Sequence, residues 1–227
     1  MRYPLLAMLS AASLVSPAYA LPVVDQTGNL IANGNFEAGN ETPVTSGYAT
    51  AAASPLAGWN QWANSGPVTT AWADAPLIEG NHLARVTGNS NDGLYQYSYG
   101  YNGTYTLSAW VYVVTGSAHL ILAGNSGSLT SIGSASSQTG QWEYLTLSAS
   151  MNGSLGGPVL YAAADNSEFY IDGVWFNAGA ASTSPFDPAT GFNPNPVPEP
   201  ETYALMLAGL ALVGFAARRP GAVPFRS

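Results

Sequence analysis

The 227-residue sequence contains no cysteine and no lysine. Without cysteine, the chain can form neither a disulfide framework nor a metal site with thiolate ligands. Its stability must therefore come from a hydrophobic core, with or without a bound ion that prefers oxygen ligands. The length allows one medium-sized domain together with targeting segments.

Positive charge is almost missing from the middle of the chain. Between residues 21 and 196 only Arg85 is basic, whereas eleven residues are acidic, so this stretch carries a net charge of about −10. A surface of that sign repels phosphate backbones, and we expect no nucleic-acid partner.

Catalytic motifs are also missing. His82 and His119 are the only histidines, no Gly-x-Ser-x-Gly motif lies near either of them, and no His-x-x-x-His pair occurs. Paired carboxylates for glycoside cleavage depend on separation in space, so a small glycoside hydrolase stays open as an alternative. The sequence nevertheless favours a protein that is not an enzyme.

Residues 1–20 have the features of a secretory signal peptide. Arg2 gives the positive start, residues 5–15 are apolar, and Ala18-Tyr19-Ala20 fits the small-x-small cleavage pattern. The alternative is an N-terminal anchor that is never cut. Both predict that residues 21–196 face the outside of the inner membrane.

The last thirty residues combine a Pro-rich acidic tetrad, an uncharged apolar run and two arginines. The run from 203 to 217 would span about 22 Å as a helix, less than the roughly 30 Å of a hydrocarbon core. Flanking arginines can reach the headgroups and mark the cytoplasmic end, so we expect a transmembrane helix at 202–217. The alternative is a buried C-terminal helix of a soluble domain, but the run lacks a polar face.

This order of features resembles the PEP-CTERM sorting signal of Gram-negative bacteria, here over residues 197–220 with a short tail at 221–227. The resemblance implies processing by an exosortase, with anchoring in the inner membrane in transit. It also implies delivery to the cell surface or extracellular matrix. The residues that carry it are Val197, Pro198, Glu199, Pro200, Arg218 and Arg219.

The region from 21 to 177 shows alternating β-branched and aromatic segments separated by Gly- and Asn-rich turns. Asn102-Gly103 and Asn152-Gly153 are strong turn signals, and no segment before Thr202 has helical periodicity of useful length. About eight short strands with this spacing predict an all-β protein with an antiparallel β-sandwich, or jelly roll. Residues 178–196, rich in Ala, Ser, Pro and Asn, are interpreted as a linker.

A second resemblance rests on five pieces of sequence in a fixed order. They are residues 29–37 (NLIANGNFE), Gly58-Trp59, residues 94–111, Gly140-Gln-Trp142 and residues 169–174 (FYIDGV). Together they are similar to jelly-roll carbohydrate-binding modules of the CBM4/9 type within the galactose-binding-like superfamily. The resemblance implies a structural calcium ion held by Glu37 and Asp172, although Gly173 stands where that family usually has a second acid.

Aromatic residues supply the candidate ligand-binding site. Tyr95, Tyr97, Tyr99 and Tyr101 alternate, so a regular strand would place them on one face with Gln96 opposite. Aromatic rings pack on the apolar faces of sugars, while amides and hydroxyls bond the sugar hydroxyls. The alternative is that these tyrosines form part of the core or a cross-strand ladder. The candidate residues are Trp59, Trp62, Trp72, Tyr95, Tyr97 and Tyr99.

Taken together, the sequence predicts an exported, surface-sorted protein that binds carbohydrate or exopolysaccharide. The expected partners are an exosortase, a polysaccharide and, before processing, the inner membrane. A structural or adhesive matrix protein without a sugar site is the alternative, and a small glycoside hydrolase is a third.

Overall fold

The computed structural model describes residues 23–39, 47–49, 56–63, 68–72, 77–124, 132–194 and 209–210. The expected signal peptide, the sorting residues 197–200 and 218–219, and nearly all of the expected helix at 202–217 lie outside the described residues. Within the described ranges, no helix is long and apolar enough to cross a membrane.

The described chain forms eleven strands and one short 3-10 helix. The strands are β1 (Gly47–Ala49), β2 (Asn60–Ala63), β3 (Val68–Trp72), β4 (His82–Gly88), β5 (Gly93–Tyr95), β6 (Asn102–Thr115), β7 (Ala118–Ala123), β8 (Ile132–Ala135), β9 (Trp142–Asn152), β10 (Gly157–Ala162) and β11 (Ser167–Ala178), and the helix is η1 (Pro188–Thr190). The predicted turn at Asn102-Gly103 instead lies at the start of the long strand β6. Residues 37–72, which are rich in Gly, Ala, Ser, Thr and Pro, contain three of the strands.

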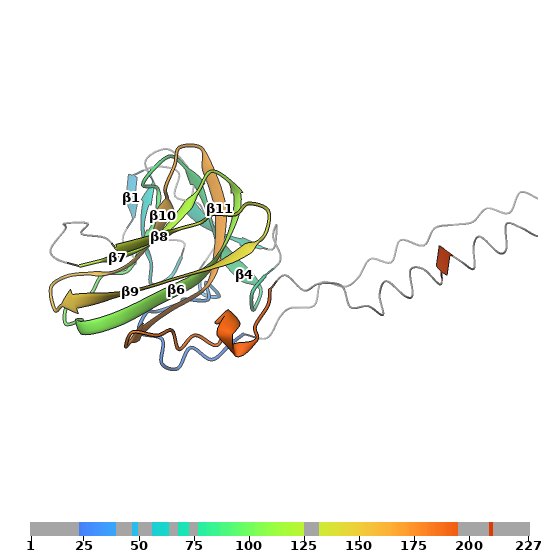
Figure 1. Ribbon diagram of the computed structural model, residues 1–227. Helices are drawn as coiled ribbons and strands as arrows, with labels where there is room; N and C mark the ends of the chain where they lie inside the picture. The colour runs from blue at the N-terminus through green and yellow to red at the C-terminus, as the bar shows by residue number, and fades with distance from the viewer. Residues whose placement is uncertain are drawn as a thin grey trace, which may run out of the picture.

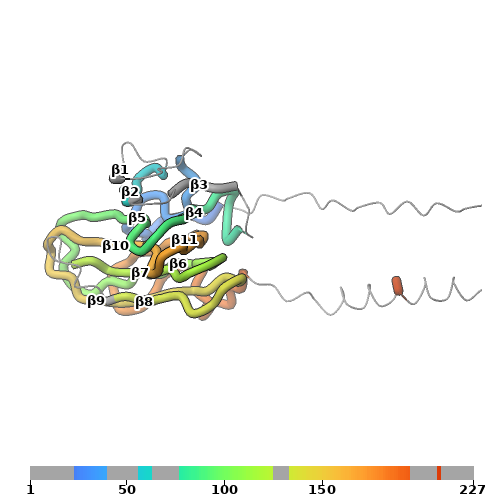
Figure 2. The backbone as a smooth tube through the Cα atoms, turned by 90° about the horizontal axis from the view of Figure 1, so that it is seen from above, coloured from blue at the N-terminus to red at the C-terminus, as the bar shows by residue number. Residues whose placement is uncertain are grey.

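These strands form two sheets in which every pairing is antiparallel. Sheet A has the order β1-β2-β5-β10-β7-β8, and sheet B has the order β3-β4-β11-β6-β9. The chain changes sheet repeatedly: between β2 and β3, at each step from β4 to β7, and at each step from β8 to β11. Figure 1 shows the long strands β6, β9 and β11 of sheet B together with β7, β8 and β10 of sheet A. In Figure 2, β5, β10 and β7 lie in one layer and β4, β11 and β6 in the other. The predicted all-β antiparallel sandwich is confirmed.

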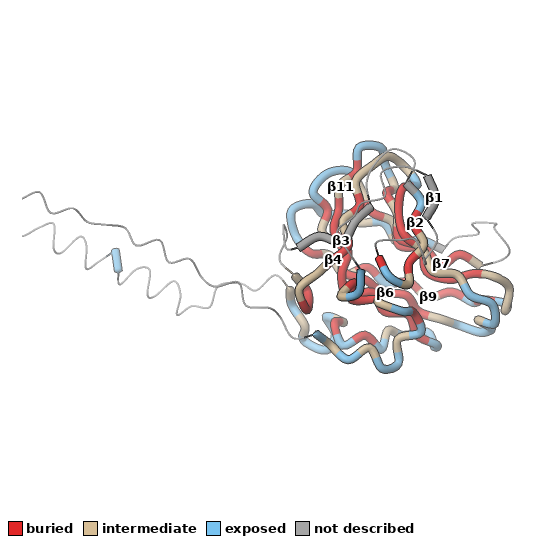
Figure 3. The backbone as a smooth tube through the Cα atoms, turned by 180° about the vertical axis from the view of Figure 1, so that it is seen from behind, coloured by how far each residue is buried: buried red, intermediate tan, exposed pale blue. Residues whose placement is uncertain are grey.

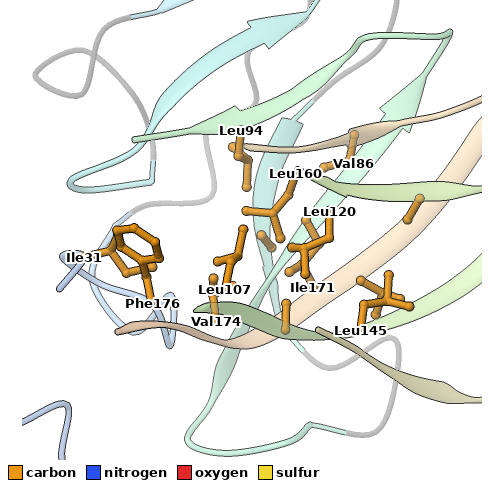
Figure 4. Close-up of a cluster of buried hydrophobic side chains, with 14 of the residues drawn as sticks. Ile31, Val86, Leu94, Leu107, Leu120, Leu145, Leu160, Ile171, Val174 and Phe176 are labelled. Atoms are coloured by element: carbon orange, nitrogen blue, oxygen red, sulfur yellow. The ribbon is translucent and has the colours of Figure 1, made fainter. Parts of the chain in front are cut away.

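The main core lies between the two sheets. Strand β9 shows why the sequence folds this way, because Leu145, Leu147, Ala149 and Met151 face inward while the residues between them are more exposed. Leu94, Leu120 and Leu160 from sheet A meet Leu107, Ile171 and Val174 from sheet B (Figure 4). Burying each such side chain contributes about 1.5–3 kcal/mol. In Figure 3 the strands are mostly buried and the connecting loops mostly exposed.

The outer face of sheet B is covered by the C-terminal part of the domain, residues 179–194, which we call the strap. Phe186 of the strap is 2% exposed and packs with Trp110, Trp142, Tyr170, Leu83 and Ile78. The helix η1 within the strap is capped by the Asp187 side chain at one end and by left-handed Gly191 at the other. In Figure 1 the strap is the orange segment below β6 and β9.

The strap corrects one sequence prediction. Residues 178–196 were expected to form a linker because they are rich in Ala, Ser, Pro and Asn, yet residues 179–194 belong to the folded domain. The composition did not indicate that two isolated aromatic residues, Phe186 and Phe192, hold this segment on the sheet. Both pack against Trp110, and the Phe192 ring centroid lies 5.8 Å from that of Trp110.

Candidate ligand-binding face

The outer face of sheet A carries a group of aromatic side chains brought together by strand register. In one row across the sheet, Trp62 lies opposite Gly93, Gly93 opposite Tyr161, and Tyr161 opposite His119. In the next row, Asn60 lies opposite Tyr95, followed by Val159 and Ile121. Directly opposed residues in antiparallel strands share a face, so these side chains lie on the same surface.

Ring contacts join four members of this group in two pairs. Tyr95 and Tyr97 lie 4.6 Å apart between ring centroids, with their planes inclined by 45°. His119 and Tyr161 meet edge to face at 5.8 Å and 89°. The three tyrosines rest on a buried apolar floor of Ile121, Ala123 and Val159. We call Trp62, Tyr95, Tyr97, His119 and Tyr161 the aromatic face.

Gly93 allows Tyr161 to lie across the sheet. A Cβ atom at this position would come within 2.5 Å of the Tyr161 Cβ and 2.2 Å of the Leu160 carbonyl oxygen. Any other residue at position 93 would therefore push β10 away from β5. Gly93 itself is buried, because Tyr161 and the main chain of Leu160 lie against it.

None of the five residues of the aromatic face is an acid, a lysine or an arginine. Burial raises the pKa of Tyr97, and the neighbouring Tyr161 adds to this rise. Burial alone raises the pKa of Tyr161. Both phenols therefore stay protonated at neutral pH, and each offers a hydroxyl that can donate and accept hydrogen bonds.

Among the predicted aromatic ligand residues, Trp59 belongs to the core. Its ring is fully buried, stacks on Phe36 at a centroid distance of 5.4 Å, and donates its indole N–H to the Asn33 carbonyl oxygen over 2.9 Å. Because no face of the ring is exposed, we do not keep Trp59 as a ligand-binding residue. Trp62 is 44% exposed and lies on the aromatic face. Trp72 lies on β3 in the other sheet, and its side chain is not among those that the structure describes.

The four alternating tyrosines do not share one face, because the strand ends at Tyr95. Beyond it, Gly100 has a φ of 93° and turns the chain. Tyr99 is 74% exposed outside the aromatic face, whereas Tyr101 turns inward and meets Phe176 edge to face at 5.0 Å. Gln96 does point away from the tyrosines, and its amide bonds both main-chain groups of Ala32.

Sequence reasoning missed Tyr161 and His119. Neither lies in an aromatic cluster of the sequence, and they join the aromatic face only because β10 pairs with both β5 and β7. A pairing pattern of this kind has no signal in a single strand's sequence.

The two predicted calcium residues hold the segment before β4 through its main-chain N–H groups. Glu37 accepts hydrogen bonds from the main-chain nitrogens of Asn81 and His82 at 2.7 and 2.9 Å, and its other oxygen lies 3.3 Å from the His82 ring. Asp172 is fully buried and accepts from the nitrogens of Ile78 and Glu79 at 3.0 and 3.3 Å. The two acids therefore act on the same segment, residues 78–82.

Glu79, which the sequence did not single out, adds a third carboxylate. It is 1% exposed and accepts a hydrogen bond from the Val24 main-chain nitrogen. Burial raises the pKa of Glu79 to about 7; the Val24 N–H opposes the rise, and the charge of Glu37 adds to it. Burial also raises the pKa of Asp172 well above its usual value, with Glu79 contributing.

The donor chemistry of these three acids suits calcium, which prefers oxygen ligands. However, the oxygens of Glu37 and Asp172 already accept hydrogen bonds from the protein. Among the described residues, no group of three or more His, Cys, Asp or Glu side chains is placed to hold a metal ion. A calcium site at Glu37 and Asp172 therefore stays a prediction.

Gly173 has a packing role in place of a second acid. Its φ is 56°, in the left-handed region, and it lies in a bulge where the pairing of β11 with β6 shifts between Asp172 and Trp175. A Cβ atom there would lie 3.1 Å from the Phe186 ring of the strap. The glycine thus allows both the bulge and the close approach of the strap.

Comparison with known proteins identifies the C-terminal segment. Residues 196–219 match the PEP-CTERM protein-sorting motif, which confirms the resemblance. The motif indicates an exported protein that is anchored in the membrane before cleavage. No curated protein matches this chain.

Several solved structures of carbohydrate-binding modules are similar to the sandwich. "Family 16 Carbohydrate Binding Module-2" is 20% identical, with a TM-score of 0.45, over 66% of this chain and 100% of that one. "TmCBM61 in complex with beta-1,4-galactotriose" is 14% identical, with a TM-score of 0.44, over 66% and 99% of the two chains. The CBM22-1 xylan-binding domain from Paenibacillus barcinonensis Xyn10C is 17% identical, with a TM-score of 0.44, over 65% and 93%.

Proposed function

We propose that the exported domain is a non-catalytic carbohydrate-binding module that binds a polysaccharide on the aromatic face of sheet A. The supporting observation is the contrast between the two outer faces. The aromatic cluster on sheet B is covered by the strap, whereas no described segment covers the aromatic face.

A sugar ring would use the groups present on this face. The C–H side of a pyranose packs on Tyr95, Tyr97 or Trp62, because ring faces attract apolar C–H groups. Sugar hydroxyls would bond the phenols of Tyr97 and Tyr161 and the amide of Asn60 on the neighbouring strand. Because Trp62, Tyr161 and His119 lie in one row across the strands, an extended chain would lie across the strands as well.

The charge of the domain favours a neutral polysaccharide. The aromatic face offers no arginine or lysine to a uronate or sulfate, and the sole arginine of the domain, Arg85, is paired with Glu168 at 2.7 Å in sheet B. With about ten net negative charges, the domain repels anionic chains at low salt. Delivery to the cell surface or extracellular matrix of a Gram-negative bacterium, after exosortase processing, would place it among such polysaccharides.

The test is binding of the fragment 21–194 to a glycan array and to insoluble polysaccharides. We expect retention on a neutral polysaccharide, competition by its soluble oligosaccharide and little dependence on salt. No retention on any glycan would contradict the proposal and favour a structural matrix protein. Release of reducing sugar, lost on substitution of one carboxylate, would favour a hydrolase instead.

A further inference from the structure

The strap ends directly before the sorting motif. The last described residue of the domain is Pro194, and the matched motif begins at residue 196. From Pro194 to Pro198 the chain can extend at most about 14 Å, however it is arranged. This reach is about half the roughly 30 Å width of a small domain.

The strap is fixed to sheet B along its whole length. Near its start, Gly179 donates to the Thr104 carbonyl oxygen over 2.8 Å, and its own carbonyl oxygen accepts from the Thr106 hydroxyl over 2.7 Å. In its middle, the Ser182 hydroxyl lies 2.9 Å from the Tyr144 hydroxyl, and the Trp175 indole donates to the Thr183 hydroxyl over 3.0 Å.

The far end of the strap is held by aromatic packing. Phe186 is buried and meets Phe192 edge to face at 5.4 Å. Phe192 also lies against Trp110, only two residues before Pro194. While these rings stay in place, Pro194 stays beside sheet B, and an active site that cuts near Pro198 must come within about 14 Å of it.

We propose that the strap governs access of the membrane-bound processing enzyme to the sorting motif. With the strap closed, Pro198 at the start of the motif stays within about 14 Å of Pro194. With the strap released from Gly179 onward, the twenty residues from Gly179 to Pro198 can extend to about 70 Å. Release breaks contacts on the outer face of sheet B and leaves the core between the sheets intact, so it is a local opening.

The experiment follows the full chain in a host that contains its exosortase, by pulse-chase and immunoblot. One variant carries ten Gly/Ser residues after Pro194. The insert lets the motif extend farther from the folded domain while the strap stays closed. The matched control carries the same insert after Arg219, beyond the motif. The apparent affinity of the processing enzyme decreases when only a small fraction of the substrate has an accessible motif. We therefore expect the insert after Pro194 to shorten the half-life of the unprocessed chain about tenfold, and the insert after Arg219 to leave it unchanged.

A second variant, Phe186→Ala, loosens the strap without changing the chain length. We expect faster processing here too, with folding monitored by tryptophan fluorescence. Equal half-lives for the two inserts would overturn the proposal, and this arm remains decisive if Phe186→Ala fails to fold. A folded Phe186→Ala chain processed at the original rate would also overturn it. The proposal does not depend on carbohydrate binding.

Discussion

The indole N–H of Trp110 on β6 donates to the main-chain carbonyl oxygen of Phe186 over 2.9 Å, in a buried contact between residues 76 positions apart. The only side-chain donor of Trp110 is thus paired with a segment that follows the last strand, β11. The aromatic surface of sheet B is thus covered by the chain itself, whereas no described segment covers the aromatic face of sheet A.

The first prediction concerns this contact. Phe186→Ala should lower the free energy of unfolding by about 3 kcal/mol, because it removes a buried ring and leaves a cavity beside Trp110. Chemical denaturation of fragment 21–194 measures the change. Val114→Ala, an exposed position near the end of β6, is the matched control, with an expected change below about 0.5 kcal/mol. Equal stability of both variants would mean that residues 179–194 act as a linker.

The second prediction concerns the aromatic face. Tyr97→Ala and Tyr161→Ala should each weaken polysaccharide binding about tenfold, since each removes a ring and a hydroxyl from the proposed site. Tyr144→Phe on the outer face of sheet B is the control and should bind as the original chain does. Isothermal titration with the oligosaccharide that competes on the array measures the affinities. Unchanged affinity in both alanine variants would remove sheet A from the proposed function.

The third prediction is a pH dependence of stability. The pKa of Glu79 is about 7 in the folded domain and near 4.5 when unfolded, so the folded state binds protons more tightly between these values. The contribution is fully present below pH 4.5 and is lost as the pH rises to about 7, by at most about 3 kcal/mol. Thermal melts in chelator from pH 5 to 7 should show a falling melting temperature.

Glu79→Gln provides the check on that assignment. The glutamine keeps an acceptor for the Val24 N–H but cannot ionise, so the slope between pH 5 and 7 should shrink. Glu143→Gln, on an edge strand of sheet B, should keep the slope. A slope that is identical in all three proteins would assign the effect to other groups.

The fourth prediction tests calcium. A bound cation would offset the charges of Glu37, Glu79 and Asp172, so calcium at pH 7 should raise the melting temperature and chelator should lower it. Elemental analysis of the purified domain gives an independent readout. A melt that is unaffected by chelator, from protein free of metal, would reject the calcium site.

The fifth prediction concerns proteolysis. In fragment 21–194 trypsin can cut only after Arg85, because lysine is absent and no other arginine lies there. Arg85 lies on β4 between β3 and β11, opposite Thr69 and Tyr170. We expect the native fragment to resist trypsin and to yield two pieces only when it unfolds. Rapid cutting well below the melting temperature would show that β4 opens locally.

Much of the architecture followed from the sequence alone. Alternation in stretches such as Trp142–Asn152 fixes which side chains are buried, and the absence of cysteine and of helical periodicity leaves a sandwich with an apolar core. The sorting segment was recognisable because its parts are contiguous and their order is specific. These properties depend on neighbours along the chain.

Tertiary structure decided what depends on neighbours across the sheets. Trp59 and Trp62 lie three residues apart, yet one is buried on Phe36 and the other is exposed beside Gly93. Tyr161 and His119 reached the aromatic face only through strand register, and Phe186 turned a linker-like segment into a strap because Trp110 offers it a partner. Composition records how many apolar groups a segment has, but only the fold determines whether a complementary surface lies within reach.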